Sequence, residues 1–200
     1  MDRSTQRPTR KTRSDVVRNR ERLLDAAKDV LGQGGPDASL EAVARRAGLG
    51  IGTLYRHFPT REALYEAVYR REVDELVTLA ERLAAQHDPV EALRLWLRAA
   101  VAMVATKKGM ITALALTADT TSAISARVTQ RLTAAVAGLL DAAVAAGRLR
   151  GDLTGEELLM SLVGLCMLRD QPGWQDSAMK MIEVMIDGLR VRGDVSADRP

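Results

Sequence analysis

Residues 39–58 read SLEAVARRAGLGIGTLYRHF, a pattern that predicts two short helices joined by a tight turn. The apolar and small residues of the first helix share one face at i, i+3, i+4 and i+7: Leu40, Val43, Ala44 and Ala47. Ser39 stands where an N-cap hydroxyl accepts a hydrogen bond from the first turn. Gly48 can take the left-handed conformation that ends a helix. A second helix is predicted over residues 53–58, so the stretch is a helix-turn-helix.

The outward positions of this unit carry donors suited to phosphates and base edges. Arg56 is predicted to read guanine in bidentate fashion, with a phosphate contact as the alternative. Thr53 can bond a phosphate or touch a thymine methyl, and His57 is predicted to bind a phosphate. Arg45 and Arg46 are predicted to reach the backbone, with one of them only solvated. The predicted DNA-binding residues are Arg45, Arg46, Ile51, Gly52, Thr53, Tyr55, Arg56 and His57.

The run GLGIGTLYRHFPTREAL, residues 48–64, resembles the DNA-binding signature of the tetracycline-repressor (TetR) family. The resemblance covers residues 19–69, and the rest of the chain is similar to the family only in length and helical character. It implies that Tyr55 is half core and half phosphate ligand. It also implies a homodimer whose rear part binds a small molecule that spreads the two DNA-reading heads and releases DNA.

The predicted fold is all-α, with about nine helices. A disordered basic arm (1–18) precedes a three-helix helix-turn-helix DNA-binding domain (19–65). A larger helical effector-binding and dimerisation domain (66–190) and a disordered tail (191–200) follow. The first helix is predicted over 19–31, and Lys107-Lys108-Gly109 is predicted to break the chain between two helices. Helix starts are predicted at Thr60, at Asp88-Pro89 and at the capping box Thr154 to Glu157.

Composition favours helices, because aromatic residues make up only 3% of the chain while hydrophobic residues make up 46%. A single cysteine, Cys166, excludes an internal disulfide and suits a reducing cytoplasm. No apolar run reaches the roughly 18 residues that span a bilayer. The basic, polar N-terminus does not resemble a signal peptide. The chain is therefore expected to be cytoplasmic.

Charge is distributed unevenly along the chain. Residues 1–62 carry 13 Lys/Arg against 8 Asp/Glu, a net charge of +5, while the whole chain has a net charge of +3. A basic front favours nucleic acid as a partner, although a solvated charged face is the alternative. The arm is equally well interpreted as a phosphate or minor-groove binder and as an ordinary flexible terminus.

The last two predicted helices, 155–168 and 174–190, are apolar on more than one face. Such helices must be buried on more than one side, which predicts a four-helix interface with a partner chain. The predicted interface residues are Leu158, Leu162, Leu165, Met181, Val184 and Met185. Two reading units held about one DNA turn (roughly 34–36 Å) or a multiple of it apart give useful specificity, so a near-palindromic operator is predicted together with the dimer.

An effector cavity is predicted from residues that could line it: Trp96, Met103, Met110, Leu114, Thr117 and Met167. Methionine is a flexible lining residue, yet plain core packing is the more common role for it. Few charged residues lie inside the predicted helices, which indicates a largely apolar effector. The alternative is an effector-independent DNA-binding or architectural protein of the same fold.

Catalysis has little support in the sequence. The two histidines, His57 and His87, have no partner at metal-ligand spacing, and Cys166 lies within an apolar helix. The glycines of residues 48–52 lack the spacing and the preceding strand of a dinucleotide-binding loop. No cofactor and no metal are expected, and an enzyme on a helical scaffold is the third hypothesis.

Overall fold

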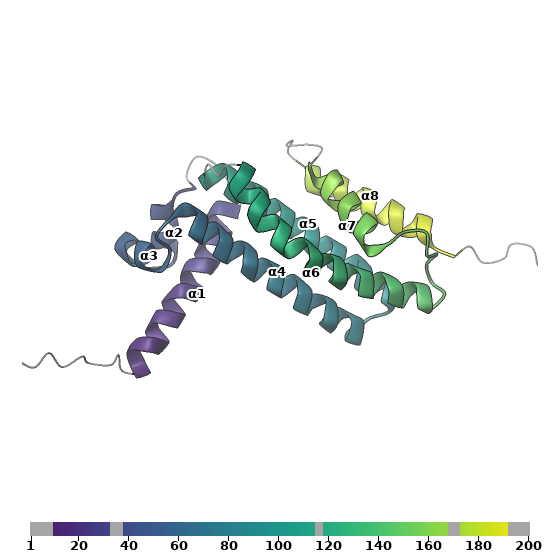
Figure 1. Ribbon diagram of the computed structural model, residues 1–200, viewed down its shortest axis with the longest axis horizontal. Coiled ribbons are helices and arrows are strands. Elements are labelled where there is room, and N and C mark those ends of the chain that lie inside the picture. The colour runs from purple at the N-terminus through teal and green to yellow at the C-terminus, as the bar shows by residue number, and fades with distance from the viewer. Residues whose placement is uncertain (1–9, 33–37, 115–117, 168–172, 192–200) are drawn as a thin grey trace, which may run out of the picture. The chain divides into compact units, whose positions relative to one another are not determined.

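The computed structural model describes residues 10–32, 38–114, 118–167 and 173–191, with side chains except at 10–13, 112–113, 118–127 and 167. Within these ranges there are eight α-helices and no strand (Figure 1). They are α1 (Arg10–Gly32), α2 (Leu40–Arg46), α3 (Ile51–His57), α4 (Arg61–Gln86), α5 (Pro89–Leu114), α6 (Ala118–Ala145), α7 (Gly155–Met167) and α8 (Trp174–Leu189). The all-α prediction is confirmed; about nine helices were predicted, and the described ranges hold eight because residues 110–114 continue α5 instead of starting a helix of their own.

The chain forms two compact units. Unit 1 comprises residues 1–68 and 106–118, and unit 2 comprises residues 69–105 and 119–200. The end of α5 thus belongs with the helix-turn-helix, whereas the sequence predicted a single division between residues 65 and 66. Helices α4 and α5 each run without interruption from one unit into the other.

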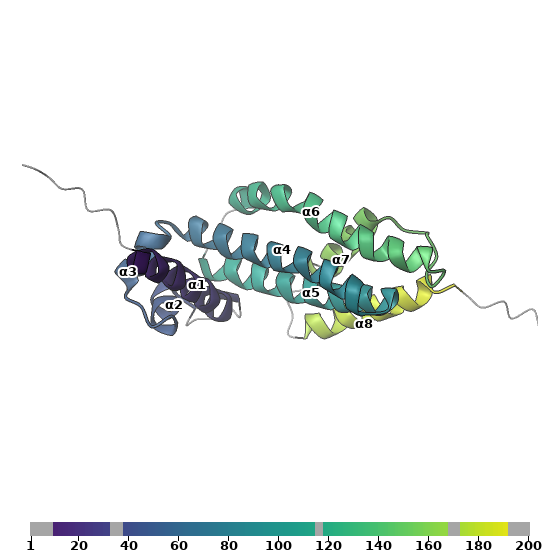
Figure 2. The same ribbon diagram turned by 90° about the horizontal axis from the view of Figure 1, so that it is seen from below.

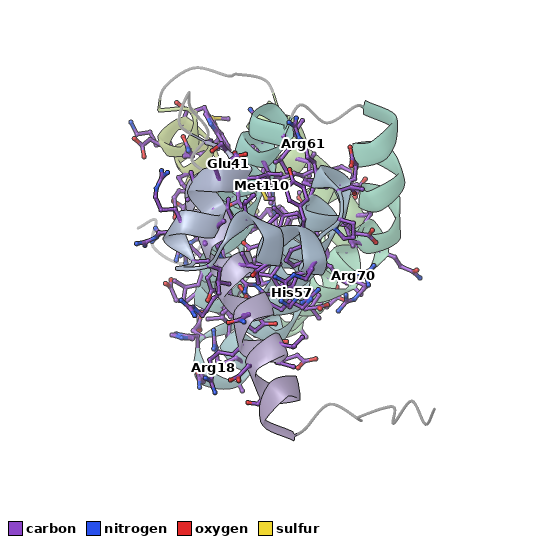
Figure 3. The ribbon with its side chains drawn as sticks, turned by 90° about the vertical axis from the view of Figure 1, so that its left-hand side faces the viewer. Arg18, Glu41, His57, Arg61, Arg70 and Met110 are labelled. Carbon is purple, nitrogen blue, oxygen red and sulfur yellow. The ribbon has the colours of Figure 1, made fainter. Side chains whose placement is uncertain are left out.

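The break that the sequence predicted at Lys107-Lys108-Gly109 is absent, because α5 continues through Gly109. A Cβ atom at Gly109 would collide with the carbonyl oxygen of Gly32 and would lie 2.8 Å from that of Leu31. Glycine therefore serves here to let two helix backbones touch. Met110, the next residue, is fully buried within unit 1 (Figure 3).

The first helix begins at Arg10, well before the predicted start at residue 19, so residues 10–18 are helical rather than disordered. Its polar residues include good helix formers, and Arg18 pairs with Asp15 one turn earlier at 3.4 Å. Extending a formed helix is easier than starting one. Residues 1–9 of the predicted arm and 192–200 of the predicted tail lie outside the described residues.

The helix-turn-helix forms through the local signals that the sequence shows. The Ser39 hydroxyl accepts a hydrogen bond from the Ala42 N–H at 3.1 Å. Gly48 has a φ of 66°, and the N–H groups of Gly48 and Leu49 donate to carbonyls of the last turn of α2. This is the glycine-ended helix predicted from the sequence. Helix α3 begins two residues earlier than predicted, after Gly50.

The other predicted caps are also present. The Ala63 N–H donates to the Thr60 hydroxyl at 3.1 Å, and the Val90 N–H donates to Asp88 at 3.1 Å. Thr154 and Glu157 form the reciprocal capping box, with the Thr154 N–H donating to the Glu157 carboxylate at 2.8 Å. That backbone bond, joined by one from the Thr154 hydroxyl, holds the pKa of Glu157 below its usual value.

Unit 2 contains parts of α4, α5 and α6 together with α7 and α8, held together by buried apolar residues and by polar contacts. The indole N–H of Trp96 in α5 donates to the Leu76 carbonyl of α4 at 2.9 Å. Helix α7 lies beside α8 (Figure 2). Glu183 of α8 accepts from Arg94 at 2.7 Å and from Arg98 at 2.9 Å, both in α5. These charged bonds fix α8 against α5.

Candidate nucleic-acid interface

Helix α3 divides its residues between a buried and an exposed side. Leu54 and the following Phe58 are buried in unit 1, as their i, i+4 spacing predicts. Ile51 and Tyr55 are 37% and 46% exposed, although the Ile51 side chain is apolar and that of Tyr55 is apolar except for its hydroxyl. Gly52 and Arg56 are exposed beside them, while Thr53 and His57 are half-buried. One side of α3 therefore offers a protruding surface with mixed apolar and donor groups.

Arg56 is tethered without losing its donors. Its Nε–H donates to the Gly52 carbonyl one turn earlier at 3.2 Å. The two terminal nitrogens remain available for a bidentate contact with an acceptor pair. The tether limits the rotamers of a long side chain, which lowers the entropy lost when that contact forms.

The two arginines that end α2 differ in their surroundings. Arg46 pairs with Asp29 of α1 at 3.1 Å, so its charge is partly matched inside the protein. Arg45 is exposed and has no ion-pair partner within the described part of the chain. Between the two, Arg45 is the residue whose charge is more open to a phosphate.

Two arginines of α1 support this face and were missed in the sequence. The Arg20 guanidinium lies over the Phe58 ring, 5.4 Å from its centroid. An Arg22 terminal nitrogen lies 2.7 Å from where a side chain of Gly48 would begin. The only sequence signal is their position directly before the buried stripe that starts at Leu23.

The predicted dimer residues separate into accessible and inaccessible side chains. Met181 and Val184 of α8 are 51% and 65% exposed, and Leu165 and Met185 are half-buried. Leu158 and Leu162, which were also predicted for the interface, are buried in the core of their own chain. Met160 of α7, which was not among the predicted residues, is 48% exposed. Its outward position could not be read from a helix that is apolar nearly all round.

The six predicted effector residues are not brought together in one unit. Trp96 and Met103 are buried in unit 2, whereas Met110 and Leu114 are buried in unit 1. Thr117 and the side chain of Met167 lie outside the described residues. Unit 2 instead has an open groove of about 490 Å3 between α4 and α6, and its walls include none of the six. The groove is lined by Val77, Ala80, Glu81, Ala84, Arg131, Ala134, Ala135, Gly138 and Leu139.

Other kinds of site find no support in the part of the chain that the structure describes. Its His, Cys, Asp and Glu side chains form no group of three that could hold a metal ion. Cys166 is buried. None of the described helices is both long enough and apolar enough to cross a membrane.

The first three helices form a basic unit in which α3, the second helix of the helix-turn-helix, is exposed. This arrangement is typical of a DNA-binding protein.

Models of known protein families match both the N-terminal and the C-terminal part of the chain. A model of the bacterial regulatory proteins of the tetR family matches residues 23–68. A model of the C-terminal domain of SbtR-like transcriptional regulators matches residues 88–191, more than half of the chain. The chain belongs to the TetR family.

Two solved structures are similar over nearly their whole length. The TetR transcriptional regulator SCO0520 from Streptomyces coelicolor is 38% identical, with a TM-score of 0.74 over 87% of this chain and 99% of that one. A TetR regulatory protein from Mycobacterium vanbaalenii is 33% identical, with a TM-score of 0.68 over 90% of this chain and 99% of that one.

Curated relatives match over shorter stretches. The HTH-type transcriptional regulator SAR0097 of Staphylococcus aureus is 34% identical over 39% of this chain and 42% of its own length. The HTH-type transcriptional repressor KstR of Mycolicibacterium smegmatis is 38% identical over 32% of each. The chain thus matches less than half the length of these relatives. The protein is a DNA-binding transcriptional regulator of the TetR type, a family of regulators and not of enzymes.

Proposed function

We propose that the protein is a homodimeric repressor that binds a near-palindromic operator and is released from it by a small, largely apolar molecule. The observation that supports sequence-specific DNA binding is the exposed side of α3. There, Ile51 and Tyr55 protrude beside an Arg56 whose terminal donors are free. Arg56 reads guanine, and Ile51, Gly52 and Thr53 allow the helix start to approach the base edges. Tyr55, His57 and Arg45 bind phosphates.

The dimer is formed through α7 and α8. Met160, Met181 and Val184 leave large apolar side chains in water on the single chain, and a self-complementary interface removes them from it. Leu165 and Met185 complete this surface at its half-buried edge. We refer to Met160, Leu165, Met181, Val184 and Met185 as the dimer face.

The effector is proposed to enter unit 2. The groove between α4 and α6, about 490 Å3 in volume, falls within the range of small-molecule sites. Alanines and a glycine line most of it, with Glu81 and Arg131 as its charged residues. An apolar molecule that occupies this groove has contacts to gain with both helices, and α4 continues directly into unit 1.

A second candidate is a DNA-binding protein of the same fold that responds to no small molecule. It is favoured by the complete burial of Trp96, whose indole N–H already has a partner in Leu76. Met103, Met110 and Leu114 are buried as well, which also favours a role in the core.

The experiment that tests the function is binding to the DNA upstream of the protein's own gene, against scrambled DNA, over a salt series. Specific binding of one dimer per site that survives about 150 mM salt supports the regulator. Equal, salt-sensitive binding to both DNAs contradicts sequence reading at that site. A screen of apolar molecules then measures operator release, with Gly138→Leu as the variant that fills the groove. Release that is unaffected by Gly138→Leu excludes the groove as the effector site.

A further inference from the structure

The groove between α4 and α6 is hollow because small side chains line both of its walls. Helix α4 contributes Ala80 and Ala84, and α6 contributes Ala134, Ala135 and Gly138. Nothing lies within 4 Å of the point where a side chain of Gly138 would begin. The two helices lie next to each other in both views of unit 2 (Figures 1 and 2), and the space between them measures about 490 Å3. An apolar ligand therefore has contacts to gain along both walls.

The positive charge of the groove is already matched within the protein. A terminal nitrogen of Arg131 in α6 donates to the Asp74 carboxylate of α4 at 2.6 Å. This ion pair joins the two helices beside the groove. Asp74 precedes Glu81 by two turns of α4, which separates the two residues by about 10 Å along the helix axis. Arg131 is thus held by Asp74 and not by Glu81.

The negative charge of the groove is unmatched. The Glu81 side chain is exposed and has no ion-pair partner in the described part of the chain. The alanines beside it supply no side-chain donor. A carboxylate at the edge of an apolar groove loses water when a ligand covers it, which costs free energy unless the ligand brings a partner. The lining therefore leaves one carboxylate for the ligand to match.

We infer that the groove selects a molecule with an apolar body and a single positive charge, a protonated amine, which Glu81 binds. This inference rests on the proposed effector site and specifies the class of its ligand. A neutral ligand leaves Glu81 without a partner as water is displaced, and an anionic ligand is repelled by it. Arg131 attracts an anion only weakly, because Asp74 neutralises its charge.

The test uses the full-length protein without DNA and three probes that share one apolar body: phenylbutylamine, phenylbutanol and phenylbutanoate. At pH 7 the first is a cation, the second is neutral and the third is an anion. Calorimetric titration gives the dissociation constant of each. The variants are Glu81→Gln and Arg131→Gln. The matched control is Glu75→Gln, which removes the same charge from α4 outside the groove lining, where Glu75 pairs with Arg71.

The wild type is expected to bind phenylbutylamine about fivefold more tightly than phenylbutanol, the upper range for an exposed ion pair, and to bind phenylbutanoate least tightly. Glu81→Gln is expected to abolish the preference for the amine and to leave phenylbutanol binding unchanged. Arg131→Gln and Glu75→Gln are expected to retain the preference. Equal wild-type affinity for the three probes, no binding of the amine, or the same loss in Glu75→Gln as in Glu81→Gln overturns the inference.

Two further outcomes would also overturn the inference. Tightest binding of phenylbutanoate, weakened by Arg131→Gln, would make the groove an anion site. Gly138→Leu, which fills the groove, is expected to weaken all three probes, and amine binding that survives this change would lie elsewhere on the protein.

Failure of the proposed effector role is distinguishable, because it appears in operator release and not in these titrations. A groove that prefers the amine as expected supports the charge selectivity, even where apolar amines leave the complex with operator DNA intact. That second result would refute ligand-controlled release alone.

Discussion

Arg56 donates one hydrogen bond within α3 and keeps its terminal donors for another partner. Arg56→Ala is therefore expected to remove about 1–3 kcal/mol of discrimination at one base position per half-site. Arg45→Ala, which removes an unpaired charge from α2, is expected to weaken operator and scrambled DNA alike and to lower the salt slope by about one. Titrations with single-base operator variants measure both effects. Equal losses on all sequences for Arg56→Ala would reassign it to a phosphate.

Gly109 tolerates no side chain, because the carbonyls of Leu31 and Gly32 occupy the space of a Cβ atom. Gly109→Ala is expected to lower the free energy of unfolding by about 1–3 kcal/mol through overpacking. Gly138→Ala is the matched control, since nothing lies within 4 Å of its Cβ position. It is expected to stabilise α6 by up to about 1 kcal/mol. Urea unfolding of both variants measures these changes in the free energy of unfolding. An unchanged free energy for Gly109→Ala would contradict the close approach of α5 to the end of α1.

At the residue scale, the sequence predicted correctly those residues whose hydrogen bonds lie within the first turn of the same helix. Ser39, Thr60 and Thr154 cap helices as predicted, since a cap needs only the next few N–H groups. It did not predict the ion pair of Arg46 with Asp29, because Asp29 lies in another helix. The separation along the chain hides such pairs from any local pattern.

At the scale of elements, Glu183 joins α8 to α5 through Arg94 and Arg98. Burial of Glu183 raises the pKa of its carboxyl, but the bonds from the two arginines outweigh this and the pKa is lowered overall. A lowered folded pKa stabilises the protein above the unfolded value, about 4.3, and this contribution disappears as the pH falls through the folded pKa.

Glu183→Gln is accordingly expected to lower the melting temperature at pH 7 and to flatten its decline in acid. Thermal unfolding between pH 3 and pH 7, by circular dichroism, measures this (the range follows from the ordinary carboxyl pKa). Glu81→Gln is the control, because Glu81 is exposed and has no ion-pair partner among the described residues. If the melting temperatures of Glu183→Gln and wild type fell in parallel with pH, the ion pairs of Glu183 with Arg94 and Arg98 would not stabilise the packing of α8.

Element boundaries were least predictable where a helix continues without a core. Helix α1 extends to Arg10 although residues 14–18 are exposed, because neither proline nor glycine stops it between residues 10 and 31. Helix α5 passes through Lys107-Lys108-Gly109 for a tertiary reason. The segment is partly buried, which lowers the pKa of Lys107 by desolvation, and no local rule distinguishes such a stretch from a turn.

At the scale of the whole molecule, the proposed dimer face is expected to control operator binding, because one reading unit offers few base contacts. Replacing Met181 and Val184 by glutamate is expected to yield folded monomers that bind an isolated half-site but lose tight binding to the full palindrome. Light scattering and DNA titration measure the two effects. Gln175→Glu adds charge elsewhere on α8 as the control. Dimers that persist in the double variant would place the interface on another surface.

The sequence by itself determined the helix-turn-helix, the helix caps and the all-α class. These depend on periodicity and on hydrogen bonds within a turn or two, which neighbouring residues specify. Only the tertiary structure decided which stripe of α7 and α8 stays in water. Leu158 and Leu162 turn inward, whereas Met160, Met181 and Val184 remain exposed. It also decided that the end of α5 joins unit 1 at Gly109. Both outcomes depend on contacts between residues distant in sequence, where packing selects among faces that are equally apolar.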